Sequence, residues 1–527
     1  MSWQEGTEAD NCLVGSRTRC DPSRIRDSDR RQLMHSRTLQ DSRIVSRQAI
    51  GPSVVSGPDW GETGRNILRQ TLMCSIPVTL LLAFGRVTLA GACFWALFPL
   101  MLVRLVFLRR PDEFVCLVIA LAPWVNLLRD FLFYSSVIVL YAFSAIYYNR
   151  CYNGRVRRVL GDSPETLAVL IYVSLYYLLS VLNTGSYESN IKMLQLPLSM
   201  ILLLSIGGSR TLVASALVGV AVSSVGFGLG MLPLLETGGG RLGMIVVDGH
   251  TLGNPVTLGA PLAYSLLAIV GDGGEWLMVA RKRLFRIVLL AATVILLGLT
   301  TSRTGWLMAA AGMSILLVFD RKARIPVLVV VAIVAVTLQV LLSSPLGDGV
   351  QKGIDRTFGE DRTTVGRSSG RSDQWKVAYN AVNNSSVETL FLGEGPGRGA
   401  SVYARLSALD PDVRYAAGEP AQWHSLFLQV IIELGLVGLL PLLAWFLAIL
   451  ILLIKAMSKI RRFLPLVSLI ACLVVNLTVV GNSTVDGMFV GITLLPIVWA
   501  RQRRRDRRLS SISFKKNVTT KDDALAF

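Results

Sequence analysis

Long apolar runs recur between residues 67 and 500 and alternate with short polar stretches. Most contain about 16–22 residues, the length of helix that crosses the hydrocarbon core of a bilayer. The runs are continuous rather than alternating, which disfavours a transmembrane β-barrel. The pattern predicts an all-α polytopic membrane protein with about 12–14 transmembrane helices and one large extracytoplasmic loop. The predicted spans are 67–84, 88–107, 114–128, 131–148, 166–182, 192–207, 211–232, 256–270, 286–302, 304–319, 325–342, 426–454, 463–480 and 485–500.

Basic residues lie mainly in the two terminal tails and in the loops that follow every second span. "NRCYNGRVRR" and "KAMSKIRR" are rich in Lys and Arg, whereas "TGSYESN" and "GNSTVDG" are poor in them. Because cytoplasmic loops carry the excess of positive charge, we expect both termini in the cytoplasm and an even number of spans. Merging adjacent pairs of runs would leave about twelve or ten spans with the same orientation.

The polar segments divide the chain into parts. The first tail is rich in Arg and Ser and lacks the residues for a core, so we expect it to be disordered. The parts are this cytoplasmic tail (1–65), a first group of spans (66–342), the large extracytoplasmic loop (343–423), the C-terminal spans (424–500) and a basic cytoplasmic tail (501–527).

The loop from 343 to 423 is far longer than the usual connection of about 4–6 residues, and long ordered loops are often functional. Within it, "GRSDQWKVAYNAV" has the pattern of a short amphipathic helix. We expect Ser372 to cap this helix, and Trp375, Tyr379 and Val382 to share one face at the membrane surface.

The composition agrees with this organisation. Hydrophobic residues make up 52% of the chain and charged residues 17%, with a mean hydropathy of +0.53. A soluble domain has about 25% charged residues, so a soluble protein is excluded. The net charge of +18 comes from tails and short loops, and no nucleic-acid partner is expected. The seven cysteines show no metal-ligand spacing, so we expect neither a structural disulfide nor a metal site.

Arg303 is the most informative charged residue on the expected outer side. It lies in "TTSRTGW", a very tight turn between two spans that is rich in hydroxyl groups. An arginine at the end of a span commonly extends to the interface, but an outer position opposes the positive-inside bias. A fixed guanidinium that faces a polar cavity is well suited to bind phosphate with two hydrogen bonds.

Other candidate groups fall on the same side. Arg241 lies among glycines that allow close approach of a ligand, and Asp248 and His250 follow it. Arg371 begins the short helix of the large loop. Each has an ordinary alternative, because a loop arginine or histidine is often only solvated.

His424 is one of three histidines in the chain and stands where the large loop enters an apolar run. An imidazole titrates near neutral pH and can accept and return a proton, although histidine at a helix start is also simply tolerated. Glu433 follows about 13 Å along the same helix. A carboxylate in an apolar segment tends to face a cavity or a partner, so Glu433 is expected to orient a neighbouring group.

Four segments, in order, resemble motifs of the O-antigen ligase-like superfamily, over roughly residues 160–500. The superfamily comprises O-antigen ligases, O-antigen and exopolysaccharide polymerases, and some protein O-oligosaccharyltransferases. Val256 and Ser425 stand where asparagine is common in the family. The segments are "GRLGMIVVDGHTLGNPVTLG", "TTSRTGW", "GRSDQWKVAYNAV" with "FLGEGPG", and "WHSLFLQVIIELGLVGLL".

The resemblance implies transfer of a glycan from an undecaprenyl diphosphate carrier to an acceptor hydroxyl at the outer face of a bacterial inner membrane. Arg241 and Arg303 would bind the diphosphate, and His424 would act as the general base or position the acceptor. No cofactor or metal is implied. The acceptor, whether lipid A core, protein or growing glycan, stays open, and other polysaccharide-assembly proteins are candidate partners.

The substrate-binding candidates are Arg371, His250, Glu433 and Trp375. The main alternative function is a multi-span secondary transporter of a small solute. A transporter usually places ionisable residues near the midplane, in broken helices of repeated halves, and this chain shows few such charges and no clear repeat. A structural scaffold is a third interpretation, and it predicts that no single outer arginine matters.

Overall fold

The structure, a computed structural model, describes most of the apolar part of the chain. Outside the described residues lie nearly all of the N-terminal tail, the basic C-terminal tail, most of the large loop, Arg241, Asp248 and His424. The described residues are 62–127, 134–184, 194–235, 242–243, 245–247, 250–252, 255–271, 283–343, 351, 371–407, 425–460, 463–478, 488 and 490–501.

Helices make up almost all of the described secondary structure. Those of the first half are α2 (Glu62–Ala83), α3 (Val87–Phe107), α4 (Pro111–Ala120), α5 (Ala122–Leu127), α6 (Tyr134–Cys151), α7 (Arg155–Asp162), α8 (Pro164–Thr184), α10 (Gln195–Ile206), α11 (Arg210–Met231) and the short 3-10 helix η3 (Leu232–Leu234). The next are α12 (Pro255–Gly271), α13 (Arg283–Leu299), α14 (Arg303–Phe319) and α15 (Arg324–Leu342). The last are α18 (Arg371–Asn383), α19 (Val387–Leu392), α20 (Gly399–Ser407), α21 (Leu426–Ile460), α22 (Leu464–Thr478) and a helical stretch over 490–501.

The prediction of an all-α polytopic membrane protein is confirmed. Among the described residues, five helices are long and apolar enough to cross a membrane, and shorter apolar helices cover most of the other predicted spans. The only described strands, β1 (Ile245–Val247) and β2 (His250–Leu252), form a small antiparallel hairpin in which Val247 pairs with His250. The five helices are Glu62–Ala83, Val87–Phe107, Pro164–Thr184, Thr211–Leu234 and Leu426–Ala456.

The predicted span at 114–128 is divided between two helices. α4 ends at Ala120 and α5 begins at Ala122. Pro123 explains the division, because proline has no amide hydrogen to donate to the carbonyl of residue 119 and its ring crowds that carbonyl. α4 is buried along its whole length, so this segment lies within the bundle.

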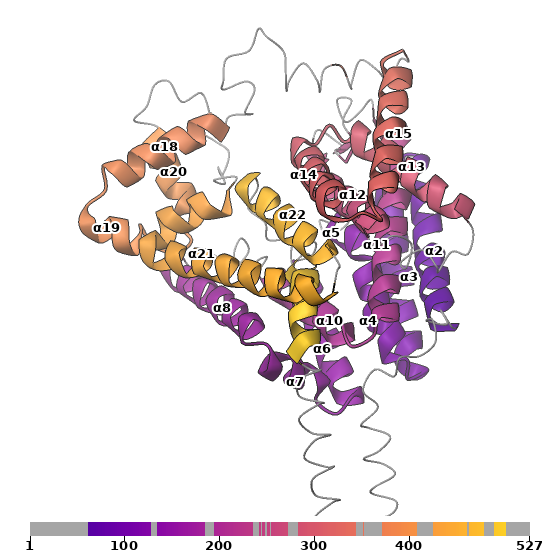
Figure 1. Cartoon of the computed structure of the whole chain (residues 1–527), viewed down its shortest axis with the longest axis horizontal. Coiled ribbons are helices and arrows are strands. Elements are labelled where there is room, and N and C mark those ends of the chain that lie inside the picture. Colours follow the sequence, from indigo (N-terminus) through magenta and orange to yellow (C-terminus); the bar gives the residue numbers. More distant parts are fainter. Residues whose placement is uncertain are drawn as a thin grey trace, which may run out of the picture. The chain divides into compact units, whose positions relative to one another are not determined.

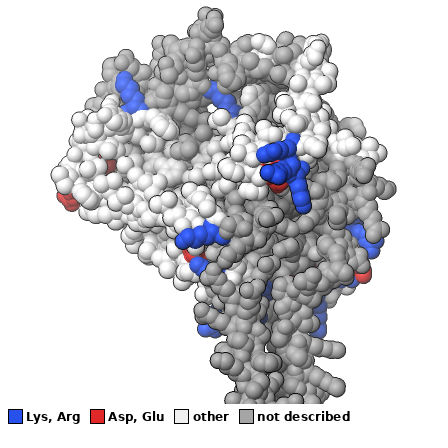
Figure 2. Space-filling view, viewed as in Figure 1, with Lys and Arg blue, Asp and Glu red and all other residues white. Residues whose placement is uncertain are grey.

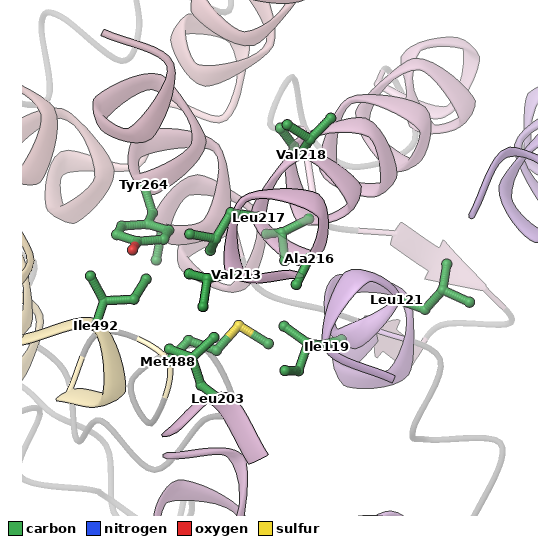
Figure 3. Close-up of a cluster of buried hydrophobic side chains, with 14 of the residues drawn as sticks. Ile119, Leu121, Leu203, Val213, Ala216, Leu217, Val218, Tyr264, Met488 and Ile492 are labelled. Carbon is green, nitrogen blue, oxygen red and sulfur yellow. The ribbon is translucent and has the colours of Figure 1, made fainter. Parts of the chain in front are cut away.

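α11 is the central helix of the described bundle and packs against α2, α4, α5, α12 and α13. In its span, 83% of the residues are buried inside the protein, against 17% in α8. Figure 3 shows the apolar side chains around it, with Val213 and Leu217 of α11 facing Leu203 of α10 and Tyr264 of α12. α11 is therefore an interior helix, whereas α8 presents most of its surface outward.

The outward surface of these helices is largely uncharged. Figure 2 shows mostly white described residues on the visible face, with basic side chains in separate small groups. On α8, the exposed side chains include Leu167, Ile171, Leu175 and Leu178. Exposed leucine and isoleucine along a long apolar helix are what contact with lipid tails requires.

The helices of the large loop gather at the N-terminal part of α21, where α18, α19 and α20 all contact that helix (Figure 1). A small separate core joins α18 and α20 to α21 and is formed by Val377, Ala378, Val402, Tyr403 and Ile432. The large loop thus contains a helical unit with its own apolar contacts to a membrane span.

Candidate functional site

The turn that carries Arg303 joins α13 to α14 and is buried. Thr301 has a positive φ of 47°, which is uncommon for a residue with a branched side chain. Ser302 caps α14, because its Oγ accepts a hydrogen bond from the Gly305 amide at 3.2 Å. Arg303 is the first residue of α14, and its side chain is half-buried.

Hydroxyl groups in the turn are used to hold its shape. Thr300 Oγ1 donates to the carbonyl of Leu297 at 2.7 Å and accepts from the Ser302 amide at 3.2 Å. Trp306 Nε1 also donates to the Leu297 carbonyl, at 3.1 Å. The turn that presents Arg303 is therefore fixed by its own side chains on both helices.

Two parts of the glycine-rich segment, which runs from 240 to 259, contact this turn. The Leu242 amide donates to the Leu299 carbonyl at 3.1 Å. A Cβ atom on Gly259 would lie only 2.7 Å from Ser302 Cβ, so the start of α12 packs against the turn without a side chain between them. The structure thus brings together two segments that are about forty to sixty residues apart in the sequence.

Of the other candidate residues, His250 and Arg371 are described by their backbone only. Arg241 directly precedes Leu242 in the sequence but lies outside the described residues. His250 begins β2 and pairs with Val247 of β1, and Arg371 begins α18.

α21 begins at Leu426, two residues after His424, which lies outside the described residues. Ser425 is buried, its Oγ accepts from the Leu428 amide at 3.5 Å, and its carbonyl accepts from the Gln429 amide at 3.0 Å. Ser425 therefore fixes the first turn of the helix.

Glu433 is buried, with 1% of its surface exposed, and its carboxylate accepts four hydrogen bonds. Oε2 accepts from the Tyr176 hydroxyl and, at 2.7 Å, from the Gly397 amide. Oε1 accepts from the Gly399 amide at 3.0 Å and from Gln429 Nε2 at 3.3 Å. Gln429 Nε2 also donates to the Tyr176 hydroxyl at 3.1 Å. Glu433 thus joins α8, α21 and the loop between α19 and α20.

α21 is broken directly after Glu433. Gly435 has φ 59° and ψ −156°, a conformation essentially restricted to glycine. The amides of Glu394 and Gly395 donate to the carbonyls of Ile432 and Glu433 at 2.8 and 3.1 Å. In a continuous α-helix those carbonyls would accept from residues 436 and 437. The predicted single span at 426–454 is therefore interrupted, and the "GEGPG" loop occupies the break.

The short loop helix is present as α18, but the prediction of its cap was wrong. It begins at Arg371, so Ser372 lies inside the helix rather than at its cap. Val377 and Ala378 face the protein, whereas Trp375 and Tyr379 are 48% and 66% exposed. The exposure of Trp375 and Tyr379 is compatible with a position at the membrane surface, which stays a prediction, whereas Val382 of the same predicted face is half-buried and packs against the small core.

A cavity of about 160 Å³ lies between α8, α21 and α22. Its lining is almost entirely apolar and includes Tyr172, Trp445 and Phe446, with Tyr176, Gln429 and Asn476 as polar members. Tyr172 and the neighbouring Val173 are only half-buried, so the α8 side of the cavity lies at the lipid-facing surface. Tyr176 and Gln429 belong to the shell around Glu433, so the cavity adjoins the broken part of α21.

Within the part of the chain that the structure describes, no three His, Cys, Asp or Glu side chains lie together as a metal-binding group. The expectation that no metal takes part stays a prediction.

In a comparison with known protein families, residues 287–443 match the family model described as O-antigen ligase. The matched segment includes the Arg303 turn, α18 to α20 and the Glu433 break, and it ends before the last spans. It confirms the resemblance to the O-antigen ligase-like superfamily and supports a membrane enzyme of the O-antigen ligase or polymerase type. No curated protein matches the chain significantly.

Proposed function

We propose that this chain, with an O-antigen ligase segment at 287–443, transfers a glycan from an undecaprenyl diphosphate carrier to an acceptor hydroxyl. The reaction would take place at the outer face of a bacterial inner membrane, with both termini in the cytoplasm. The observation that carries the proposal is the buried turn at Arg303, which the glycine-rich segment contacts at Leu242 and Gly259.

Arg303 and Arg241 are proposed to bind the diphosphate. A guanidinium can donate two parallel hydrogen bonds to phosphate oxygens and stabilise the charge that grows on the leaving group. Leu242 is hydrogen-bonded to the turn, and the Cα of Arg241 is only about 3.8 Å further along the chain. An arginine side chain at that position is long enough to reach the same ligand as Arg303.

His424 is proposed to take the proton from the acceptor hydroxyl or to position that hydroxyl. The bond that breaks joins the sugar to the diphosphate, and the lipid diphosphate leaves. Arg371, His250 and Trp375 are proposed to contact the glycan or a phosphate. Glu433 is proposed to orient its neighbours, because its oxygens are already occupied by protein donors.

The apolar cavity is proposed to receive part of the polyprenyl chain of the donor. A cavity of comparable size with an apolar lining stays dry and admits a ring the size of benzene, about 150 Å³. Its half-buried α8 side would let a lipid chain enter sideways from the bilayer. Leu426, which lines the cavity, is two residues from His424, so chain and acceptor would meet at one end of α21.

Transfer by purified variants tests the roles of the charged residues. With a polyprenyl-diphosphate glycan as donor, His424→Ala should abolish transfer and Arg303→Ala should reduce it at least about 100-fold, the scale of losing one stabilising donor. Arg321→Ala, at the exposed far end of α14, is the matched control and should retain activity. Unchanged transfer in His424→Ala would remove the base assignment.

The packing of the turn is tested without changing any charged residue. Gly259→Ala places a Cβ atom 2.7 Å from Ser302 Cβ and should displace the turn and reduce transfer. Gly298→Ala adds the same atom on α13 where nothing lies within 4 Å, so it should leave transfer unchanged. Equal activity in both variants would show that the position of the turn does not matter for the reaction.

A further inference from the structure

The loop at 393–399 and the broken part of α21 form a single docking contact, which we call the Glu433 clamp. We propose that Glu433 is a positioning residue that fixes the helical unit α18–α20 on the spans and so sets the geometry for glycan transfer. The functional half of this inference rests on the proposed function, whereas the docking half does not.

The chemistry of the clamp requires a carboxylate. All four groups that contact its oxygens donate: one phenol, one amide side chain and the backbone amides of Gly397 and Gly399. A backbone amide N–H can only donate a hydrogen bond. An NH₂ group in place of one carboxylate oxygen would therefore bring two donors face to face. Among the described residues, no Lys or Arg forms an ion pair with Glu433, so its contacts are hydrogen bonds from uncharged groups.

The backbone completes the clamp. Because Gly435 leaves the helical conformation, the carbonyls of Ile432 and Glu433 are available to the loop amides of Glu394 and Gly395. Gly393 and Gly435 lie so close together that a Cβ on Gly435 would lie 2.7 Å from the Gly393 nitrogen. A Cβ on Gly393 would lie 2.4 Å from the Glu433 carbonyl carbon. The two segments therefore fit only when both are glycine and the loop lies in the break.

α8 supplies the third side of the clamp. Asn183 Nδ2 donates to the Pro396 carbonyl at 3.1 Å, and Tyr176 of the same helix donates to Glu433. The clamp therefore joins two long apolar helices to the outer loop. Glu433 lies about 10 Å along α21 from Leu426, the first residue of that helix, and the candidate base His424 precedes Leu426 by two residues in the sequence.

Docking can be measured without any enzymatic activity. In the full chain with its native cysteines replaced by serine, Asn183→Cys and Pro396→Cys place thiols at two neighbouring residues, since Asn183 Nδ2 lies 3.1 Å from the Pro396 carbonyl oxygen. The pair removes this one hydrogen bond equally in every variant compared, so differences in rate report on residue 433. A short thiol cross-linker should join them rapidly in the otherwise native protein and about 10- to 100-fold more slowly with Glu433→Gln. Glu433→Asp keeps the acceptors and should lie between the two. An equal cross-linking rate in Glu433→Gln would overturn the docking half of the inference.

Transfer kinetics then test positioning. Glu433→Gln should lower kcat or raise KM for the acceptor, with KM for the lipid-linked donor unchanged, and the 183–396 cross-link should restore most of the lost rate. A cross-linked Glu433→Gln protein that stays inactive would show that Glu433 acts on the substrate directly. If Glu433→Gln does not accumulate, Tyr176→Phe keeps the carboxylate, removes one donor and should give a smaller loss in the same direction. Absence of transfer by the native protein would reject the proposed function alone, because cross-linking still reports on the clamp.

Discussion

Glu113 and Glu433 are both almost fully buried, but they are stabilised in different ways. Glu113 lies in the first turn of α4, where Arg110 Nη1 donates at 2.9 Å and the amides of Gln70 and Asn66 at 3.1 and 3.4 Å. Glu433 lies within a membrane span and receives only uncharged donors. One carboxylate is paired with a cation, whereas the other is held only by uncharged hydrogen-bond donors.

The difference shows which contact depends on backbone shape. At Glu113 the donors are side chains, and Arg110 is 41% exposed, so water can replace lost contacts. At Glu433 two donors are backbone amides of a glycine-rich loop, and their position depends on the break at Gly435. The Glu113 contact joins α2 to α4, while the Glu433 clamp assembles segments of three distant parts of the chain.

The largest effect is expected from Gly435→Ala. The substitution would force alanine into a backbone conformation that is essentially restricted to glycine. Its Cβ atom would also lie 2.4 Å from the Phe391 carbonyl oxygen. The cost should be about 3 kcal/mol or more, localised at the loop. Limited proteolysis of the outer loop should accelerate strongly, with Gly298→Ala as the control that stays resistant. Equal resistance of the two variants would show that the break is not required for docking.

Tyr176→Phe should have the next largest effect. It removes a neutral donor to a charged acceptor, a loss of about 1.5–3 kcal/mol. Tyr177→Phe is the matched control on the neighbouring face of α8. Thermal unfolding in detergent should show a lower midpoint for the first variant only, and a similar shift in both would assign the effect to helix packing.

Glu113→Gln should be milder, at about 1 kcal/mol, because Arg110 can return to water when its partner is neutral. High salt should weaken the native Glu113 contact modestly and leave the Glu433 clamp almost unchanged, since the partly exposed charge of Arg110 is screened whereas uncharged donors are not. The comparison of thermal midpoints at low and high salt measures this. A strong salt effect on the 183–396 cross-linking rate would contradict the contrast.

The smallest effect is expected from Trp375→Phe, because the side chain is 48% exposed and outside the clamp. We propose that Trp375 and Tyr379 lie at headgroup level. Tyrosine and tryptophan fluorescence should therefore be quenched by lipids brominated near the headgroup, and the difference between native protein and Trp375→Phe isolates one side chain. No difference would place Trp375 away from the bilayer.

Helix positions could be predicted where apolar length decides them. The runs at 88–107 and 304–319 correspond to α3 and α14 within one residue, because a helix that spans a bilayer must keep its backbone groups paired. α2 begins at Glu62, before the predicted start at 67, since polar residues can extend a helix beyond its apolar part.

The clamp could not be predicted in the same way. Gly435 lies in a continuous apolar run, where a single glycine is normally tolerated within a helix. Its partner loop at 393–397 is about forty residues away, and only the folded chain shows that four donors converge on Glu433. The sequence did indicate two segments that the fold brings together, because Leu242 is hydrogen-bonded to Leu299 beside the Arg303 turn, whereas the roles of Arg303 and Arg241 stay predictions.

The most direct test of the proposed function is release of polyprenyl diphosphate by the purified protein in liposomes. The protein should release one lipid diphosphate for each glycan transferred, without nucleotide and in the presence of a metal chelator. Ion-driven uptake of a solute by the same liposomes, with no glycan transfer and no lipid diphosphate released, would contradict the enzyme and support a transporter.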